Sequence, residues 1–214
     1  GVVQHGEMGN SKELPGDYMF KDVNGDGIID DNDKMPIFWS GTPLIHYGLT
    51  LEASWKNFDI YALFQGAGMY TVQFSETYAE ILWSKGMNTP AYFYDRWHKE
   101  DPYDPDSRWV SGKWPASRLI QDVGALYKDN SDIWRRNASY LRLKTLELGY
   151  TLPNSIIKKA GIDNVRLYVN GYNLFTFADA FVKPFDPERI EGSYNAGMNY
   201  PLTKSFNFGF TANF

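Results

Sequence analysis

Alternation between apolar and polar residues is the feature that most restricts the fold of this sequence. Apolar side chains occupy every second position in residues 45–55, and the alternation resumes in residues 58–65. A period of two places successive side chains on opposite faces of a β-strand. Because only Lys56-Asn57 separates the two runs, the sequence predicts an antiparallel hairpin.

Three later segments carry the same strand signal: residues 140–150, 165–170 and 206–214. The last of them alternates phenylalanine or alanine with small polar residues up to Phe214. Faces this different suit a barrel wall, with aromatic and aliphatic side chains outward and small or polar side chains inward. The outward residues are predicted to include Tyr47, Leu49, Leu51, Phe58, Ile60, Phe64, Val165, Leu167, Phe206, Phe208 and Phe210.

Residues 140–150 alternate with a break in phase, because Leu141 and Leu143 would lie on one face and the later leucines on the other. A β-bulge near Thr145 would shift the phase. Alternatively, the strand could extend beyond a bilayer, so that Arg142 and Lys144 meet water or lipid phosphates. The sequence leaves both explanations open.

Connection lengths favour a barrel. If strand ends alternate sides, the short turns at 56–57 and 152–163 lie on one side, and the long segments 1–43, 67–138 and 176–203 lie on the other. Short periplasmic turns and long extracellular loops are typical of outer-membrane barrels. A soluble β-sandwich that buries the apolar face would give the same alternation.

Two short helices are predicted outside the strands. One covers Ser75–Ser84, with Ser75 as its N-cap. The other covers one or two turns at 156–160, after Pro153 and a capping Ser155, with Gly161 at the C′ position.

Residues 22–33 resemble a calcium-binding loop. Carboxylates recur at alternate positions around a glycine turn, and hard cations such as Ca²⁺ prefer six to eight oxygen ligands. The twelfth residue is Asp instead of Glu, so its carboxylate reaches less far. The alternative is that two Asx-Gly pairs only form turns. The predicted ligands of a lone structural calcium site are the side chains of Asp22, Asn24, Asp26 and Asp33, the carbonyl of Ile28, and Asp30 directly or through water.

Composition excludes several functions. The net charge is −5, from 26 acidic and 21 basic residues, and no basic stripe suggests a nucleic-acid partner. No cysteine is present, and no apolar run is long enough for a membrane helix. The histidines (His5, His46 and His98) accompany no Ser or Cys nucleophile motif, so the sequence predicts no enzyme.

Aromatic residues make up 17% of the chain, and many lie in the excursion at 67–138. Such long excursions are usually functional. Indole rings stack on sugar faces, so Trp97, Trp109 and Trp114 are candidate substrate contacts. The alternative for each is packing between loops.

Several segments also resemble the SusC/RagA family of TonB-dependent outer-membrane transporters. Among them are Gly16-Asp-Tyr-Met-Phe-Lys-Asp-Val-Asn-Gly-Asp-Gly-Ile-Ile-Asp30 and Leu148-Gly-Tyr-Thr-Leu-Pro153. One departure is Pro36-Ile-Phe-Trp-Ser-Gly-Thr-Pro43, where the family usually has an Ile-Gly-Asn-Pro-like turn. The other matching segments follow in family order: 47–51, 58–66, 139–144, 168–177 and 200–206.

The resemblance implies the C-terminal strands of a large antiparallel transmembrane β-barrel with long extracellular loops. Residues 1–43 would form an extracellular loop region, and 44–214 the strands with their long excursion. The implied function is TonB-dependent import of glycan or peptide oligomers across the outer membrane, with a SusD-like surface lipoprotein as partner. TonB would act through an N-terminal region that has no counterpart here, and the remaining barrel strands would lie upstream. The alternative is a secreted calcium-dependent adhesin or lectin with a β-sandwich, which would need no detergent.

Overall fold

The computed structural model describes residues 4–5, 15–16, 20–36, 38–74, 89–116, 132–158, 161–189 and 199–214. The chain divides into two compact units. The first comprises Gly1–Ile37 and Phe74–Arg135, and the second comprises Phe38–Gln73 and Arg136–Phe214. The helix predicted at Ser75–Ser84 lies outside the described residues.

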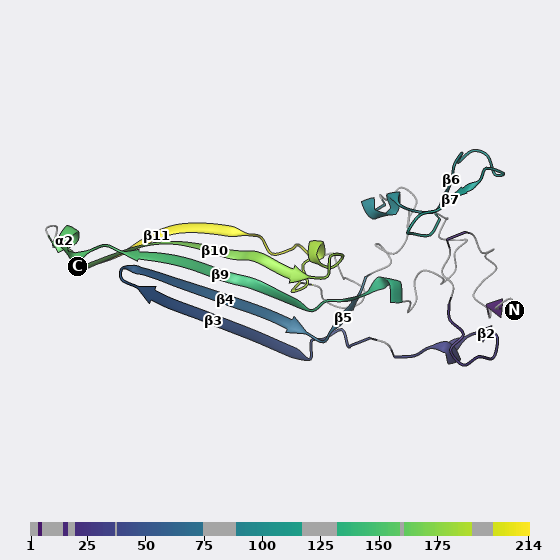
Figure 1. Ribbon diagram of the computed structural model, residues 1–214, viewed down its shortest axis with the longest axis horizontal. Helices are drawn as coiled ribbons and strands as arrows, with labels where there is room; N and C mark the ends of the chain where they lie inside the picture. Colours follow the sequence, from purple (N-terminus) through teal and green to yellow (C-terminus); the bar gives the residue numbers. More distant parts are fainter. Residues whose placement is uncertain are drawn as a thin grey trace. The chain divides into compact units, whose positions relative to one another are not determined.

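A five-stranded antiparallel sheet forms most of the second unit (Figure 1), in the order β11-β10-β9-β4-β3. This architecture confirms the predicted all-β class and the predicted strands. Lys56 has a φ of 54°, the positive value that a tight hairpin turn requires at its first central residue. The strands are β3 (Ile45–Trp55), β4 (Phe58–Gly68), β9 (Tyr140–Thr151), β10 (Asn164–Ala178) and β11 (Ser205–Asn213).

The two ends of the sheet differ, as the connection lengths predicted. The β3-β4 turn, α2 (Asn154–Ile157) and the C-terminal end of β11 lie together at one end (Figure 1). The long connections leave from the other end. The cap prediction for α2 is wrong, because the helix begins directly after Pro153 and Ser155 lies inside it. Gly161 has a φ of 71°, but it lies beyond the C′ position because Lys158 is the C-cap.

A β-bulge explains the broken phase of β9. Opposite β4, Leu63 pairs with Thr145 and Phe64 pairs with Leu143, so Lys144 is an extra residue with no partner in β4. The first of the two explanations for the phase break is therefore confirmed. The bulge brings the leucines on both sides of it to the same face of the sheet.

The bulge also affects β10. Tyr172 pairs with Thr145 and Phe175 pairs with Leu143, so two residues of β10 are unpaired at this level. One of them is Asn173, whose φ of 55° lies in the left-handed region. Asparagine tolerates this conformation better than most residues with a Cβ. The sheet is thus irregular in two adjacent strands at the same height.

Short elements complete the fold. In the first unit, β1 (Gln4–His5) pairs in parallel with β2 (Ile28–Ile29), and β6 (His98–Lys99) pairs with β7 (Trp109–Val110). None of the helices in the described residues is both long and apolar enough to cross a membrane. The remaining elements are η1 (Asp31–Asp33), β5 (Thr71–Gln73), η2 (Ala91–Tyr94), η5 (Asp132–Trp134), β8 (Arg135–Asn137), which pairs with β5, and η7 (Lys183–Phe185).

Candidate functional site

One face of the five-stranded sheet is apolar from edge to edge. Residues that pair across strands share a face, and the strand registers place every predicted outward residue on this one. The face is largely open, since Phe206 is 65% exposed and Phe208 is 85% exposed. Within the described residues, no second sheet covers these side chains, as a sandwich would require. Contiguous exposed apolar surface of this extent indicates contact with lipid or with another protein surface.

The other face carries a hydrogen-bonded ladder of polar side chains that crosses four strands. Arg166 of β10 donates to Asp59 of β4 at 2.5 and 3.0 Å, and to Glu147 of β9 at 2.7 Å. Asn170 donates to Glu147 at 3.2 Å and accepts from Asn207 of β11 at 2.9 Å. The ladder joins side chains from strands that are distant in sequence, so this face is polar and internally connected.

A glycine makes part of this ladder possible. Gly149 lies between Asp59 and Arg166 in the sheet, and a Cβ at this position would collide with both charged groups. Without a side chain, Gly149 lets the guanidinium of Arg166 cross β9 and reach the carboxylate of Asp59 on β4. Gly149 therefore allows the side chains of Arg166 and Asp59 to approach each other closely across β9.

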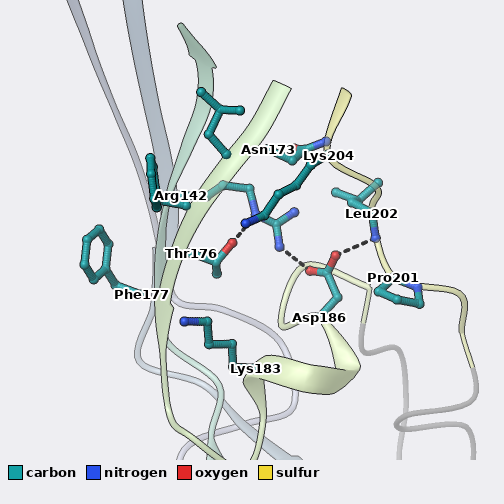
Figure 2. Close-up of a pocket in the computed structure, with 11 residues that line it drawn as sticks. Arg142, Asn173, Thr176, Phe177, Lys183, Asp186, Pro201, Leu202 and Lys204 are labelled. Atoms are coloured by element: carbon teal, nitrogen blue, oxygen red, sulfur yellow. Dashed lines mark hydrogen bonds and ion pairs between the residues drawn. The ribbon is translucent and has the colours of Figure 1, made fainter. Parts of the chain in front are cut away.

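A second polar cluster lies at the end of the sheet from which the long connections leave (Figure 2). Arg142 of β9 donates to Asp186 at 2.5 Å, to Glu188 at 2.7 Å and to Thr176 of β10 at 2.9 Å. The side chains of Arg142 and Asp186 are each 4% exposed. Lys144, the bulge residue, pairs with Glu188 at 2.5 Å. Two cations and two carboxylates balance, as buried charges require.

This cluster fastens two loop segments to the sheet. Asp186 also accepts a hydrogen bond from the backbone N–H of Leu202 at 2.7 Å. The buried hydroxyl of Tyr70 donates to the carbonyl of Pro187 at 2.8 Å. Burial raises the pKa of Tyr70 above its ordinary value, so the hydroxyl remains a donor. The segment after β10 is therefore held by several contacts that the sequence analysis missed.

The predicted calcium ligands lie together in one loop. The carboxylate of Asp22 accepts from the backbone of Gly25 at 2.6 Å and of Gly27 at 2.8 Å. The carboxylate of Asp33 accepts from the backbone of Asp30 at 2.8 Å, and this contact with a second from Val23 lowers its pKa. These contacts form when Asp33 is ionised, and they are lost as the pH falls through the lowered pKa.

The remaining predicted ligands also bond within the loop. Asp26 accepts from the backbone of Ile28 at 2.8 Å and from the side chain of Asn24 at 2.9 Å. Asp30 caps η1 and accepts from Asn32 at 2.7 Å. Among the residues that the structure describes, no group of three or more His, Cys, Asp or Glu side chains is placed to hold a metal ion. Calcium binding stays a prediction.

The three candidate tryptophans differ in exposure. Trp114 is 4% exposed and stacks on Trp134, with ring centroids 5.2 Å apart and planes 18° apart. It presents no open ring face. Trp97 and Trp109 are half-buried, and the ammonium of Lys99 lies 4.9 Å from the ring centroid of Trp109. Contact between these tryptophans and a substrate stays a prediction.

The curated proteins to which this chain is similar include three TonB-dependent receptors. TonB-dependent receptor P3 of Formosa agariphila is 31% identical over 211 residues, covering 94% of this chain and 19% of the relative. TonB-dependent receptor SusC of Bacteroides thetaiotaomicron is 27% identical over 204 residues, covering 94% of this chain and 18% of the relative. The chain thus spans about a fifth of the length of these curated relatives. No family model matches the chain.

Solved structures of RagAB are similar in fold and in sequence. The RagAB peptide importer in its open-open state matches with a TM-score of 0.61 and 26% identity, covering 87% of this chain and 19% of that chain. The closed-closed state matches with a TM-score of 0.59 and 27% identity, covering 85% of this chain and 18% of that chain. The antiparallel sheet described above therefore fits a segment of a barrel like that of RagAB.

Proposed function

The chain belongs to the SusC/RagA family of TonB-dependent receptors, and we propose that it forms part of the barrel wall of a nutrient importer in the outer membrane. The observation that carries this proposal is the contrast between the two faces of the sheet. The apolar face would contact lipid, and the polar face, with its hydrogen-bonded ladder, would line the interior.

Strand lengths fit this role. A tilted transmembrane strand needs about nine to eleven residues. β3 and β4 have 11 residues each, β9 has 12, β10 has 15 and β11 has 9. Each strand could therefore cross the hydrocarbon core. The end with the long connections would lie outside the cell, and the end with α2 would face the periplasm.

The transported substrate would be an oligomer, either a glycan or a peptide. The RagAB structures describe a peptide importer, which supports the peptide class for that protein. The half-buried rings of Trp97 and Trp109 in the first unit support sugar stacking. The family resemblance also supports pairing with a SusD-like surface lipoprotein and energy supplied by TonB.

An uptake assay tests import and separates the two substrate classes. Cells that lack the receptor carrying this chain would be offered fluorescent oligosaccharides and fluorescent peptides of matched size, with and without the restored gene. We expect uptake of one class that requires the gene, TonB and the proton-motive force. A labelled monomer small enough for general porins serves as the control. Oligomer entry at the same rate without the gene would contradict the proposal.

A further inference from the structure

A pocket of about 250 Å³ lies along the free edge of β10 (Figure 2). The β10-β11 ladder ends where Tyr172 pairs with Ser205, and beyond this point the two segments separate. The pocket occupies the gap, next to the Arg142 cluster. We call it the edge pocket. Its walls include Phe175 and Phe177 of β10, Leu202, and two lysines, Lys183 and Lys204.

The edge pocket has an excess of positive charge. Arg142, which also lines it, is neutralised by Asp186 and Glu188, and Lys144 balances the second carboxylate. Within the described part of the chain, Lys183 and Lys204 have no carboxylate partner. Both side chains are exposed and extend toward β10 (Figure 2). Two uncompensated ammonium groups at one pocket favour an anionic ligand.

The opposite wall is apolar. Phe175 and Phe177 are 60% and 65% exposed, and the strand register places them on the apolar face of the sheet. The ammonium of Lys204 lies 5.7 Å from the ring centroid of Phe175. The ammonium of Lys204 therefore lies beside the last exposed aromatic side chains of the apolar face, at the end of the sheet with the long connections. A ligand that fits both walls has an anionic head and an apolar body.

A buried acceptor adds a third requirement. Asn173 lies in the irregular part of β10, and its Oδ1 is buried without a hydrogen-bond partner among the described residues. Its Nδ2 donates to the carbonyl of Thr203 at 3.1 Å, which fixes the orientation of the amide. A buried acceptor without a partner costs free energy, so a ligand hydroxyl that donates to Asn173 would stabilise the complex.

We propose that the edge pocket binds the phosphorylated headgroup of an outer-leaflet lipid. The phosphate would contact Lys183 and Lys204, a headgroup hydroxyl would reach Asn173, and the acyl chains would follow Phe175 and Phe177. The inference rests on the proposed function, because only a membrane-embedded sheet brings lipid to this face. A free phosphate ion would satisfy the lysines but would leave the aromatic wall open.

Native mass spectrometry of the receptor that carries this chain tests the inference. The purified receptor in detergent would be titrated with lipid A, which has phosphate groups, hydroxyls and acyl chains. We expect one tightly retained lipid A, and an affinity lower by on the order of fivefold for each lysine removed in Lys183→Ala and Lys204→Ala. The double Lys→Arg variant keeps the charges and should keep the lipid. Lys158→Ala changes an exposed lysine near α2, and it should retain lipid A like the wild type.

The outcomes separate two kinds of failure. If the embedded receptor retains lipid A equally with and without the two lysines, the lipid site is wrong and the barrel wall stands. If inorganic phosphate binds and this binding requires the two lysines, while lipid A does not bind, the pocket takes a free anion. The lipid assignment is then overturned. A receptor that stays monomeric in buffer without detergent would overturn the barrel wall itself, and the lipid site with it.

Discussion

At the scale of single residues, the buried pair of Arg142 and Asp186 shows what the sequence could not reveal. Its partners lie 44 residues apart, and Asp186 belongs to a polar segment with no periodicity. In the sequence, Arg142 and Lys144 are distinguished only by their position at the break in the alternation of β9. The calcium-loop residues could be found from their spacing, because every predicted ligand comes from one short stretch.

Removing the Asp186 charge should release the segment that follows β10. Asp186→Asn leaves the Arg142 guanidinium buried with one carboxylate fewer, and breaking a buried pair costs roughly 3–5 kcal/mol. We expect faster hydrogen exchange at Leu202, whose amide donates to Asp186, and a lower unfolding temperature of the receptor. Asp163→Asn changes an exposed carboxylate and should alter neither. Unchanged exchange at Leu202 in the Asp186 variant would contradict the role of the pair.

Calcium binding should depend on the spacing of the acidic loop. We expect calorimetry of the intact receptor to detect Ca²⁺ binding that Asp22→Asn with Asp26→Asn abolishes, because both are predicted ligands. Asp31→Asn is the matched control. Asp31 belongs to the same loop but pairs with Lys34 at 2.6 Å and is not a predicted ligand. No heat of binding at millimolar Ca²⁺ would contradict the prediction.

At the scale of elements, the strands were predictable and the bulge was one of two open explanations. Alternation depends only on neighbouring residues, so each strand is visible in the sequence. The phase break in β9 indicates that the regular strand is interrupted, but it does not identify the extra residue. Only the partner strands show that Lys144 is the extra residue. The predicted cap of α2 is wrong because Ser155 resembles a capping residue, whereas the helix begins at Asn154, two residues earlier than predicted.

Deleting the bulge residue Lys144 should impair assembly of the receptor more than removing its charge. Deleting Lys144 removes the phase correction, so one half of β9 would turn its leucines to the polar face. We expect the receptor to fail in assembly, measured as its abundance in outer-membrane fractions. Lys144→Ala keeps the bulge and loses only the ion pair with Glu188, which keeps its contact with Arg142, so assembly should fall much less than in the deletion variant. Normal assembly of the deletion variant would contradict this account.

The two faces of β11 should differ in tolerance to charge. Arginine on the lipid side costs roughly 2–4 kcal/mol at the bilayer midplane. Phe208→Arg should therefore reduce assembly strongly, as measured by heat-modifiable mobility on gels. Asn207→Arg lies on the polar face, where it loses the hydrogen bond to Asn170, worth about 1 kcal/mol. Equal effects of the two changes would mean that β11 does not face lipid.

At the scale of the whole molecule, the sheet has two open edges. β3 and β11 each pair on one side only within the described residues. Unpaired backbone groups in hydrocarbon cost several kcal/mol each, so a membrane sheet must close. The family relatives, about five times as long as this chain, supply further length from which closing strands could come.

The 214 residues expressed alone should consequently aggregate or be degraded, because β3 and β11 have no partner strand on their outer sides in the described part of the chain. Coexpression with the rest of the receptor should rescue folded material, measured as resistance to protease in membrane fractions. An unrelated barrel fragment is the control, and it should give no rescue. A soluble monomer with a cooperative melt would contradict closure and restore the β-sandwich.

The unequal ends of the sheet have a consequence for evolutionary change. At the end with the Lys56-Asn57 turn, an insertion would break a two-residue connection whose first residue already has a constrained backbone. At the other end, the connections are long and can gain or lose residues without moving a strand. Descendants of this gene should therefore diverge in length mainly at that end. Under the proposed function, that end faces the nutrient, so the substrate-facing loops can change in length while the strands stay fixed.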